Sequence, residues 1–390
     1  MNSNTLNILK SALWHLPVPS DPITSEVYQE LFDQTVHLLV YDITEQCHVD
    51  ESLRERWAAN YAKQISLFAK YLAEQQELVK LLKDKDVVPV ILKGLSAAMY
   101  YPEPLYRVIG DIDFMLCPGG EERFAEITAL LKEHGFILSE KKNPRHLCFS
   151  KNGFSYEMHR HFSEKASKGE EELDRIINKS TPVEKNVNDW PEFHFYSFPD
   201  EINGLILIQH INQHLISGLG LRQIIDWMFF VEAVVTDEFW EHTFKPLADR
   251  TGLTTLAVTV TKLCEMYLGA PKHSWAADAD VSACKELFAL IEESGNFGRK
   301  RNVKDNRVTT MLNQKGLSFK GLQQRGLHHW KAAQKHKILR PFAWIYQICR
   351  YIKEGLIKRD PNYEGFFTSF KRHRQQKKLF KKLKIWQYRE

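Results

Sequence analysis

The sequence lacks any long apolar run. No run of about eighteen or more apolar residues occurs in the chain, so we expect no transmembrane helix. The amino-terminal stretch MNSNTLNILKSALWHLPVPSD has one lysine before a short, interrupted apolar segment and no small-residue cleavage site. This pattern argues against a signal peptide, and we expect a cytoplasmic protein.

Cysteines are few, and none are paired by their spacing. They are scattered along the chain, and no two of them form a CxxC pair. In a large chain without a secretion signal, this distribution indicates reduced thiols rather than a disulfide scaffold. It also argues against a zinc site built on cysteines. The six cysteines are Cys47, Cys117, Cys148, Cys264, Cys284 and Cys349.

Acidic residues are nearly missing from the carboxyl-terminal end. Residues 371–390, KRHRQQKKLFKKLKIWQYRE, carry nine lysines and arginines and one glutamate. Because the whole chain has a net charge of +4, the rest of it carries about −4, and the basicity belongs to this tail. Basic residues with interleaved aromatics can bind RNA or an anionic membrane surface. A helix docked on the body through an apolar face is the simpler interpretation.

Length and apolar patterning predict an α+β fold with large helical flanks. A chain of 390 residues is too long for one ordinary core. We divide it into a helical region (1–85), an α/β core (86–165), a second helical region (166–335) and a helical carboxyl-terminal region with the basic tail (336–390). The longest predicted helix covers residues 52–85, which are rich in helix formers and lack glycine and proline.

Four apolar segments after residue 200 predict further helices. They read EINGLILIQHINQHLI, LRQIIDWMFFVEAVV, TTLAVTVTKLCEMYL and KELFALIEES, each with apolar residues at helical spacing. SGNFGRKRNVKDNR (294–307) predicts a basic loop, and LRPFAWIYQICRYIKEGLI (339–357) predicts another helix.

Short, apolar and β-branched segments set the region 86–162 apart. VVPVIL (87–92) and GDIDFMLC (110–117) each predict a buried strand. GGEERFAEITALLKEHGF (119–136) predicts a helix that starts with acidic residues and stops at a glycine. FILSE, HLCFS and FSYEMHRHF predict three more strands.

The predicted strand DIDFML carries two charges. Because strand residues alternate between faces, Asp111 and Asp113 share one face with Met115, and Ile112, Phe114 and Leu116 share the other. Two like charges buried without partners would be unfavourable. A divalent cation held by both carboxylates removes this penalty, and Mg²⁺ prefers such oxygen ligands. An exposed strand with two solvated aspartates is the alternative.

A third carboxylate follows on a later predicted strand. In FSYEMHRHF, Glu157 lies on the polar face. Three carboxylates from neighbouring strands can hold two metal ions, which clamp the attacking and leaving oxygens in phosphoryl transfer. Asp111, Asp113 and Glu157 are therefore candidate catalytic and metal-binding residues, with two Mg²⁺ or Mn²⁺ ions as the expected cofactors.

The combination of segments resembles a known family. LKG at the end of one strand, YPEPLYRVIGDIDFML, a helix ending in HGF, and YEMHRHF are similar to the uncharacterised nucleotidyltransferase family of the DNA polymerase beta superfamily. The resemblance extends to HINQHLISGLGLRQIIDW (210–227) and covers most of residues 60–300. It implies a small mixed-sheet, polymerase-beta-like core that uses an NTP as substrate.

The resemblance also matches Asp111 and Asp113 to the metal-binding pair and Glu157 to the third carboxylate, which is usually Asp in the superfamily. Glu157 would ligate the metal beside the acceptor, accept the hydroxyl proton, or do both.

The resemblance implies nucleotide contacts as well. Gly94 stands where the superfamily commonly has a Gly-Ser or Gly-Gly pair opening a helix, whose backbone N–H groups face the triphosphate. This chain has KGLS, so Lys93 and Ser96 replace the usual serine. Arg107 lies shortly before the aspartate pair and could reach a phosphate, or form a surface salt bridge. Gly110 directly precedes the pair.

Four further residues complete the candidate set. His159 shares a strand face with Glu157 and could orient it or the substrate. Arg222 and Asp226 are four residues apart on a predicted helix, so they either form an intrahelical ion pair or line the nucleotide site. His214 lies on the preceding predicted helix.

Together these features predict a metal-dependent nucleotidyltransferase. A hydroxyl of a small molecule, a sugar or a protein would attack the α-phosphate of an NTP such as ATP, with release of pyrophosphate. Two alternatives stay open at the level of sequence. One is a nucleotide-binding or scaffold protein without turnover, and the other is a toxin-like, RNA-directed nucleotidyltransferase that docks RNA on the basic tail.

Overall fold

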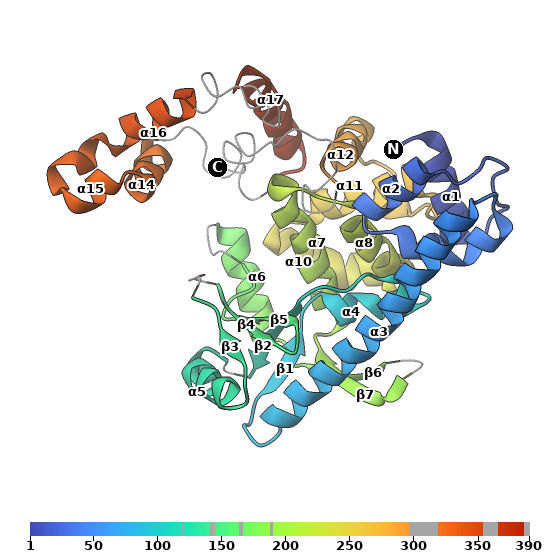
Figure 1. Ribbon diagram of the computed structural model, residues 1–390, viewed down its shortest axis with the longest axis horizontal. Helices are drawn as coiled ribbons and strands as arrows, with labels where there is room; N and C mark the ends of the chain where they lie inside the picture. The colour runs from blue at the N-terminus through green and yellow to red at the C-terminus, as the bar shows by residue number, and fades with distance from the viewer. Residues whose placement is uncertain are drawn as a thin grey trace.

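One mixed β-sheet lies among many helices in the computed structural model (Figure 1). The structure describes residues 1–118, 120–140, 143, 145–163, 167–187, 190–295, 319–353 and 366–385. The predicted α+β class is confirmed. Most of the predicted basic loop 294–307 lies outside the described residues. No helix of the described chain is both long and apolar enough to span a membrane.

Within the described residues the sheet has seven strands, in the order β3-β4-β5-β2-β1-β7-β6. β2 pairs in parallel with β5, and β1 with β7, whereas the other neighbours are antiparallel. The β4–β5 hairpin turns at Asn152 and Gly153, which both have positive φ, the backbone that tight hairpins need. The strands are β1 (Val88–Ile91), β2 (Ile112–Cys117), β3 (Ile137–Leu138), β4 (His146–Lys151), β5 (Phe154–His159), β6 (Val183–Val187) and β7 (Trp190–Ser197).

The apolar face of the sheet packs against α3 (Glu51–Leu82) and α5 (Gly120–Glu133). Ile112 and Phe114 of β2 are fully buried here, in one cluster with Phe68 of α3 and Ile127 of α5. The long α3 runs diagonally across the sheet in Figure 1 and confirms the helix predicted over 52–85. Its apolar stripe follows the helical period, which is why one side of it can cover the strands.

The opposite face of the sheet turns toward the helical body. Met115 of β2 and Val90 of β1 belong to a second core cluster with Ile211 and Ile224, which lie on α7 (Asp200–Ser217) and α8 (Leu221–Val234). The short α4 (Gly94–Ala98) contacts both helices. Because Asp113 shares a strand face with Met115, the candidate site lies on this side of the sheet.

Two strands come from beyond the predicted core boundary at residue 165. β7 pairs with β1, and β6 forms the edge beside β7. The segment of β6 reads VEKNV, which has too little apolar alternation to predict a strand, and its pairing with β7 determines its conformation. The region predicted as helical after residue 165 therefore contributes two strands before most of its helices.

The amino-terminal helices pack on the helical body. Asn2 and Thr24 cap α1 and α2, because their side chains accept hydrogen bonds from the first turn. The indole of Trp57 in α3 donates to the backbone oxygen of His37 over 2.8 Å. These elements are α1 (Ser3–Trp14), α2 (Ser25–Asp33) and the 3₁₀ segment η1 (His37–Gln46).

The remaining elements complete the body and the carboxyl-terminal region. In the body they are η2 (Pro104–Tyr106), α6 (Lys168–Lys179), α9 (Asp237–Phe239), η3 (Trp240–Phe244), α10 (Lys245–Thr251), α11 (Thr254–Leu263), η4 (Cys264–Leu268), η5 (Ser274–Ala276) and α12 (Val281–Ser294). After them come α14 (Phe319–His329), α15 (Lys331–Lys335), η7 (Lys337–Phe342), α16 (Ala343–Ile352) and α17 (Phe366–Lys382).

The described part of the basic tail is a helix docked on the body. Leu379 and Phe380 of α17 and Leu383 after it are buried in the main core. Lys382 pairs with Glu286 of α12 at 2.6 Å. The simpler of the two sequence interpretations therefore describes this helix. Its exposed face keeps the basic residues Lys371, Arg374, Lys377 and Lys378.

Candidate active site

Polar side chains of three neighbouring strands line up across the sheet. Asp113 of β2 lies directly beside Glu157 of β5, which in turn lies opposite Cys148 of β4. Two residues along, on the same face, His159 of β5 lies opposite His146 of β4. Paired residues on adjacent strands share a face. Strand alternation thus gathers two carboxylates, two imidazoles and a thiol in one patch.

Asp113 is the most firmly paired carboxylate of this patch. The residue is 3% exposed, and its Oδ1 lies 2.9 Å from Nζ of Lys93 and 2.9 Å from Nε2 of His159. Burial alone would raise the pKa of Asp113, but Lys93 and His159 outweigh burial and hold that pKa well below its ordinary value. Asp113 is therefore ionised at neutral pH.

His159 connects the two carboxylates. Its Nε2 contacts Asp113 and lies 3.5 Å from Oε2 of Glu157. Burial opposes a charged imidazole, but the contacts with Asp113 and Glu157 raise the pKa of His159. One ligand atom of each of these three residues lies within 4.8 Å of the other two.

Asp111 precedes β2 and completes the carboxylate set. The residue is exposed by area, yet desolvation of its carboxyl and the charge of Asp113 raise its pKa. Glu157 acts in the same direction, and Lys93 opposes it. Asp111 therefore lies within the electrostatic influence of Asp113 and Glu157.

Lys93 brings a positive charge to this group through an unusual backbone. It has φ 55° and ψ −144°, a conformation that side-chain-bearing residues rarely adopt. Gly94 follows with φ +47°, and a Cβ there would lie 2.4 Å from the hydroxyl of Tyr71. The glycine thus permits the turn that places the Lys93 ammonium against Asp113.

A family model described as "Uncharacterised nucleotidyltransferase" matches residues 24–269, which include the whole sheet and the carboxylate group. The chain belongs to the uncharacterised nucleotidyltransferase family. Among solved structures, it is similar to an antigenic nucleotidyltransferase-like protein from Paracoccidioides brasiliensis, with 15% identity and a TM-score of 0.35. That match covers 53% of this chain and 95% of the other. No curated protein matches the chain. The family predicted from the sequence motifs is confirmed.

Ser96 belongs to a buried polar network. Its hydroxyl lies 2.7 Å from that of Ser197 and donates to Oδ1 of Asn203 over 3.2 Å. The network joins α4 to β7 and α7, so Ser96 fixes the position of α4. Gly110 is exposed, and a Cβ there would meet nothing within 4 Å. Contact of either residue with a nucleotide stays a prediction.

Arg107 forms a buried ion pair rather than a surface salt bridge. Its Nε and Nη2 donate to the two carboxylate oxygens of Asp226 at 2.7 and 2.8 Å. Tyr101 donates to the same carboxylate over 2.7 Å, and Arg222 donates to the backbone oxygen of Val108 over 3.1 Å. Helix α8 therefore holds the segment that leads into the aspartate pair.

Two histidines of α7 lie near the same group of charges. The rings of His210 and His214 have centroids 4.5 Å apart. Burial, followed by the charges of Lys93 and Arg222, lowers the pKa of His214 to about 3. Burial also lowers the pKa of His210 well below its ordinary value. Both rings are neutral at pH 7, so they can donate and accept hydrogen bonds without adding charge.

Sequence reasoning missed several polar residues of this candidate site. His146 and Cys148 are two residues apart in HLCFS, so alternation alone places them on one face. The pairing of β4 with β5 brings that face to Glu157, and the Asn152-Gly153 turn between the two segments is the sequence signal that could have predicted this hairpin. His210 lies one helical turn before His214, a spacing that the sequence does show.

Proposed function

We propose that this protein is a metal-dependent nucleotidyltransferase that transfers the NMP of an NTP to a hydroxyl acceptor and releases pyrophosphate. The observation that carries the proposal is the placement of Asp113 beside Glu157 on paired strands, with Asp111 under their electrostatic influence. Membership of a nucleotidyltransferase family supports the same chemistry.

The donor set fits a hard divalent cation. Asp111, Asp113 and Glu157 offer carboxylate oxygens, which are the ligands that Mg²⁺ and Mn²⁺ prefer. Burial first, and then the charges of Asp113 and Glu157, raise the pKa of Asp111, and a bound cation would oppose this rise. These three residues would hold two ions, which when bound neutralise charge on the phosphates and lower the pKa of the acceptor hydroxyl.

The chain's own residues orient the reactants and move the proton. Glu157 accepts the proton of the acceptor hydroxyl as its oxygen forms a bond to the α-phosphorus. The bond from that phosphorus to the bridging oxygen breaks, and pyrophosphate leaves with the electron pair. His159, which contacts both Asp113 and Glu157, fixes the orientation of the two carboxylates.

Lys93 is the residue that we assign to the phosphates. Its ammonium pairs with Asp113, and a bound triphosphate would offer it a second anionic partner. Gly94 and Ser96 extend the same segment and complete the proposed phosphate-binding turn. Arg107 and Asp226 act instead as positioning residues, because their charged groups bind each other away from water.

Incubation of the full-length protein with each labelled NTP and Mg²⁺ or Mn²⁺ tests the proposal. We expect label from one NTP on an acceptor, either the protein itself or a co-purified small molecule. Asp111→Asn should reduce transfer by about 100-fold or more, because one stabilising charge is lost. Asp278→Asn, at an exposed aspartate of the helical body, is the matched control and should leave transfer unchanged. No transfer and no metal-dependent nucleotide binding would contradict the proposal.

A nucleotide-binding scaffold without turnover is the competing function. Such a protein would bind an NTP but transfer no label, and Asp111→Asn would leave its biological role intact. The grouped carboxylates argue against it, because burial and the charges of Asp113 and Glu157 raise the pKa of Asp111, and perturbed carboxylates of this kind cluster at functional sites.

A further inference from the structure

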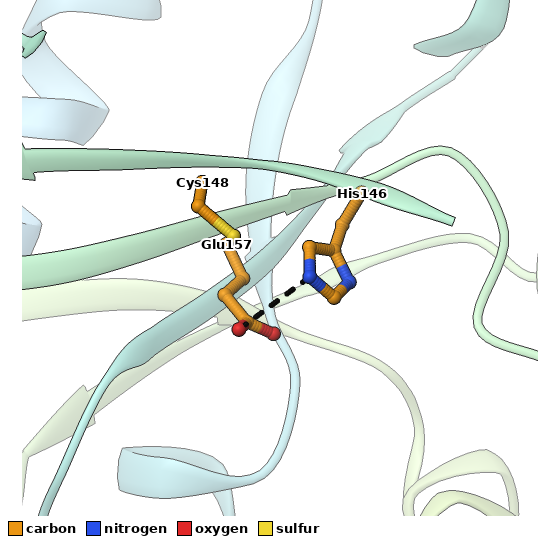
Figure 2. Close-up of side chains that lie close together, drawn as sticks. All are labelled: His146, Cys148 and Glu157. Atoms are coloured by element: carbon orange, nitrogen blue, oxygen red, sulfur yellow. Dashed lines mark ion pairs between the residues drawn. The ribbon is translucent and has the colours of Figure 1, made fainter. Parts of the chain in front are cut away.

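The face shared by β4 and β5 carries donors unlike those of the carboxylate set. His146, Cys148 and Glu157 point toward one another from the two strands, as Figure 2 shows. One ligand atom of each lies within 4.8 Å of the other two. Imidazole nitrogen, thiolate sulfur and carboxylate oxygen are the three ligand types that zinc takes in proteins.

His146 points an acceptor atom at the carboxylate of Glu157. The residue is 6% exposed, and its Nε2 lies 3.5 Å from Oε1 of Glu157 and 3.1 Å from Nδ2 of Asn143. Because an amide nitrogen only donates, Nε2 accepts from Asn143 and carries no proton. Nδ1 of the same ring has no hydrogen-bond partner among the described residues. A cation that displaced the Asn143 amide would gain Nε2 and the Glu157 oxygen as ligands together.

Cys148 completes the cluster with a softer donor. It lies directly opposite Glu157 in the strand ladder, is partly buried and forms no disulfide. Thiolate sulfur suits zinc and similar transition metals, whereas Mg²⁺ prefers oxygen. The sulfur thus gives this cluster a different metal preference from that of Asp111 and Asp113.

We propose that His146, Cys148 and Glu157 form a second metal site, which binds Zn²⁺ or a similar transition-metal ion with a fourth position open. Three protein ligands and an open position are typical of zinc sites that bind a further molecule. A tetrahedral ion would hold the donor atoms about 3.5 Å apart, and Nε2 of His146 and Oε1 of Glu157 already lie 3.5 Å apart. The sequence argued against a zinc site built on cysteines; this one needs a single cysteine, and strand pairing supplies its neighbours.

Glu157 belongs to both proposed sites. An ion held by His146 and Cys148 would engage the Glu157 carboxylate and withdraw it from the oxygen-only set. Zn²⁺ should therefore inhibit nucleotidyl transfer that Mg²⁺ supports. The site itself does not rest on the proposed function, since His146 and Cys148 have no part in that chemistry.

Titration of the metal-free full-length protein with Co²⁺ tests the site. We expect a thiolate-to-Co²⁺ charge-transfer band in the near ultraviolet, which Zn²⁺ abolishes by displacement. Cys148→Ser should remove this band and weaken Zn²⁺ binding by about 100-fold or more, because a direct ligand matters at least as much as its supporting partners. Cys349→Ser, at an exposed cysteine of α16, is the matched control and should keep both the band and the affinity.

A second variant separates ligand loss from misfolding. His146→Gln keeps the thiol and should weaken Zn²⁺ binding while circular dichroism stays unchanged. Asp111→Asn should leave the Co²⁺ band intact even where it abolishes nucleotidyl transfer, so failure of one proposal is distinguishable from failure of the other. The absence of a thiolate–Co²⁺ band, or a band that Cys148→Ser retains, overturns the second site whatever the activity.

Discussion

Arg107 and Asp226 join the segment before Asp111 and Asp113 to α8, and both are almost completely buried. A buried pair of this kind contributes little net stability by itself, because desolvation offsets the attraction. Each partner nevertheless depends on the other, since removal of one leaves an uncompensated charge. At the scale of residues, this pair holds the segment before Asp111 in position rather than binding a ligand.

Arg107→Met should lower the free energy of unfolding by about 3–5 kcal/mol, because Asp226 would stay buried without its guanidinium. The double variant Arg107→Met/Asp226→Leu should recover much of this loss. Arg175→Met, which breaks an exposed pair with Glu172, should change stability by less than about 1 kcal/mol. Urea denaturation measures all three variants, and similar effects at the two arginines would show that the Arg107 pair is not structurally important.

His37 should make stability depend on pH. Burial, assisted by the charge of Arg56, lowers the pKa of His37 from 6.5 to about 4. The unfolded chain keeps the ordinary pKa, so between pH 6.5 and 4 it binds more protons than the folded protein. The contribution of His37 is therefore complete above pH 6.5 and is lost as the pH falls toward 4, with a slope of at most about 1.4 kcal/mol per unit.

Urea midpoints at several values between pH 7.5 and 4 measure this contribution. His37→Gln removes the titrating group, so its midpoint should fall less steeply over the same window than that of the parent protein. Identical slopes for the two proteins would locate the proton uptake elsewhere in the chain.

The candidate carboxylates can be found in the sequence more easily than the residues that contact them. Asp111 and Asp113 stand out because they interrupt an apolar strand with two charges on one face. The contact between Arg107 and Asp226 joins residues 119 positions apart. A contact between residues so far apart leaves no periodic pattern in the sequence. The spacing of residues could suggest only one partner for Asp226, namely Arg222 on the same helix.

Among the elements, the turn into α4 links backbone conformation to the site. Gly94→Ala should destabilise the protein by about 1–3 kcal/mol, because φ there is positive and Tyr71 blocks the added methyl group. It should also weaken nucleotide binding, because Lys93 would move. Gly135→Ala is the control, with φ +84° but nothing within 4 Å, and should cost only the backbone strain of about 1 kcal/mol. Thermal denaturation and nucleotide titration distinguish the two, and equal effects would contradict the steric argument.

Periodicity predicted most elements of the core but not all. The long helix α3 and the strands β1, β2, β4 and β5 follow from segments with a clear helical or alternating pattern. β6 has no such pattern, because VEKNV is an edge segment with exposed residues. Pairing with the neighbouring strand determines the conformation of β6, and a short stretch of sequence does not reveal this pairing.

For the whole molecule, the docked tail contributes to the main core. Phe380→Ala should lower the free energy of unfolding by about 3–5 kcal/mol, because the ring is fully buried. Lys378→Ala, two residues earlier and exposed, should change it by less than about 0.5 kcal/mol. Chemical denaturation compares them directly, and a small effect of Phe380→Ala would mean that α17 does not pack on the body in solution.

The docking also decides how the RNA-directed alternative is tested. Deleting the tail would expose the core, so substitutions on the exposed face are the cleaner experiment. Glutamine at Lys371, Arg374, Lys377 and Lys378 should reduce the salt dependence of RNA binding, by up to about one unit of slope per lysine or arginine removed. RNA binding by the parent protein that does not vary with salt would remove this alternative.

For the molecule as a whole, the fold class and the family could be predicted from the sequence. The contacts between segments that are distant in the sequence could not. The strands of residues 86–162 and their motifs identify the nucleotidyltransferase core. The addition of β7 beside β1, and the burial of Leu379 in a core built mainly of earlier helices, depend on contacts between distant segments. Such contacts leave no pattern in the local sequence.

The two edge strands of the sheet, β3 and β6, affect how the protein behaves at high concentration. β3 is only two residues long, and β6 carries Glu184 and Lys185 on an exposed strand. A border strand can recruit a strand from another molecule when it is long, flat and apolar. Here one edge strand is too short for such pairing, and the other carries charged residues. We therefore expect that molecules of this protein do not associate through their sheet edges at high concentration.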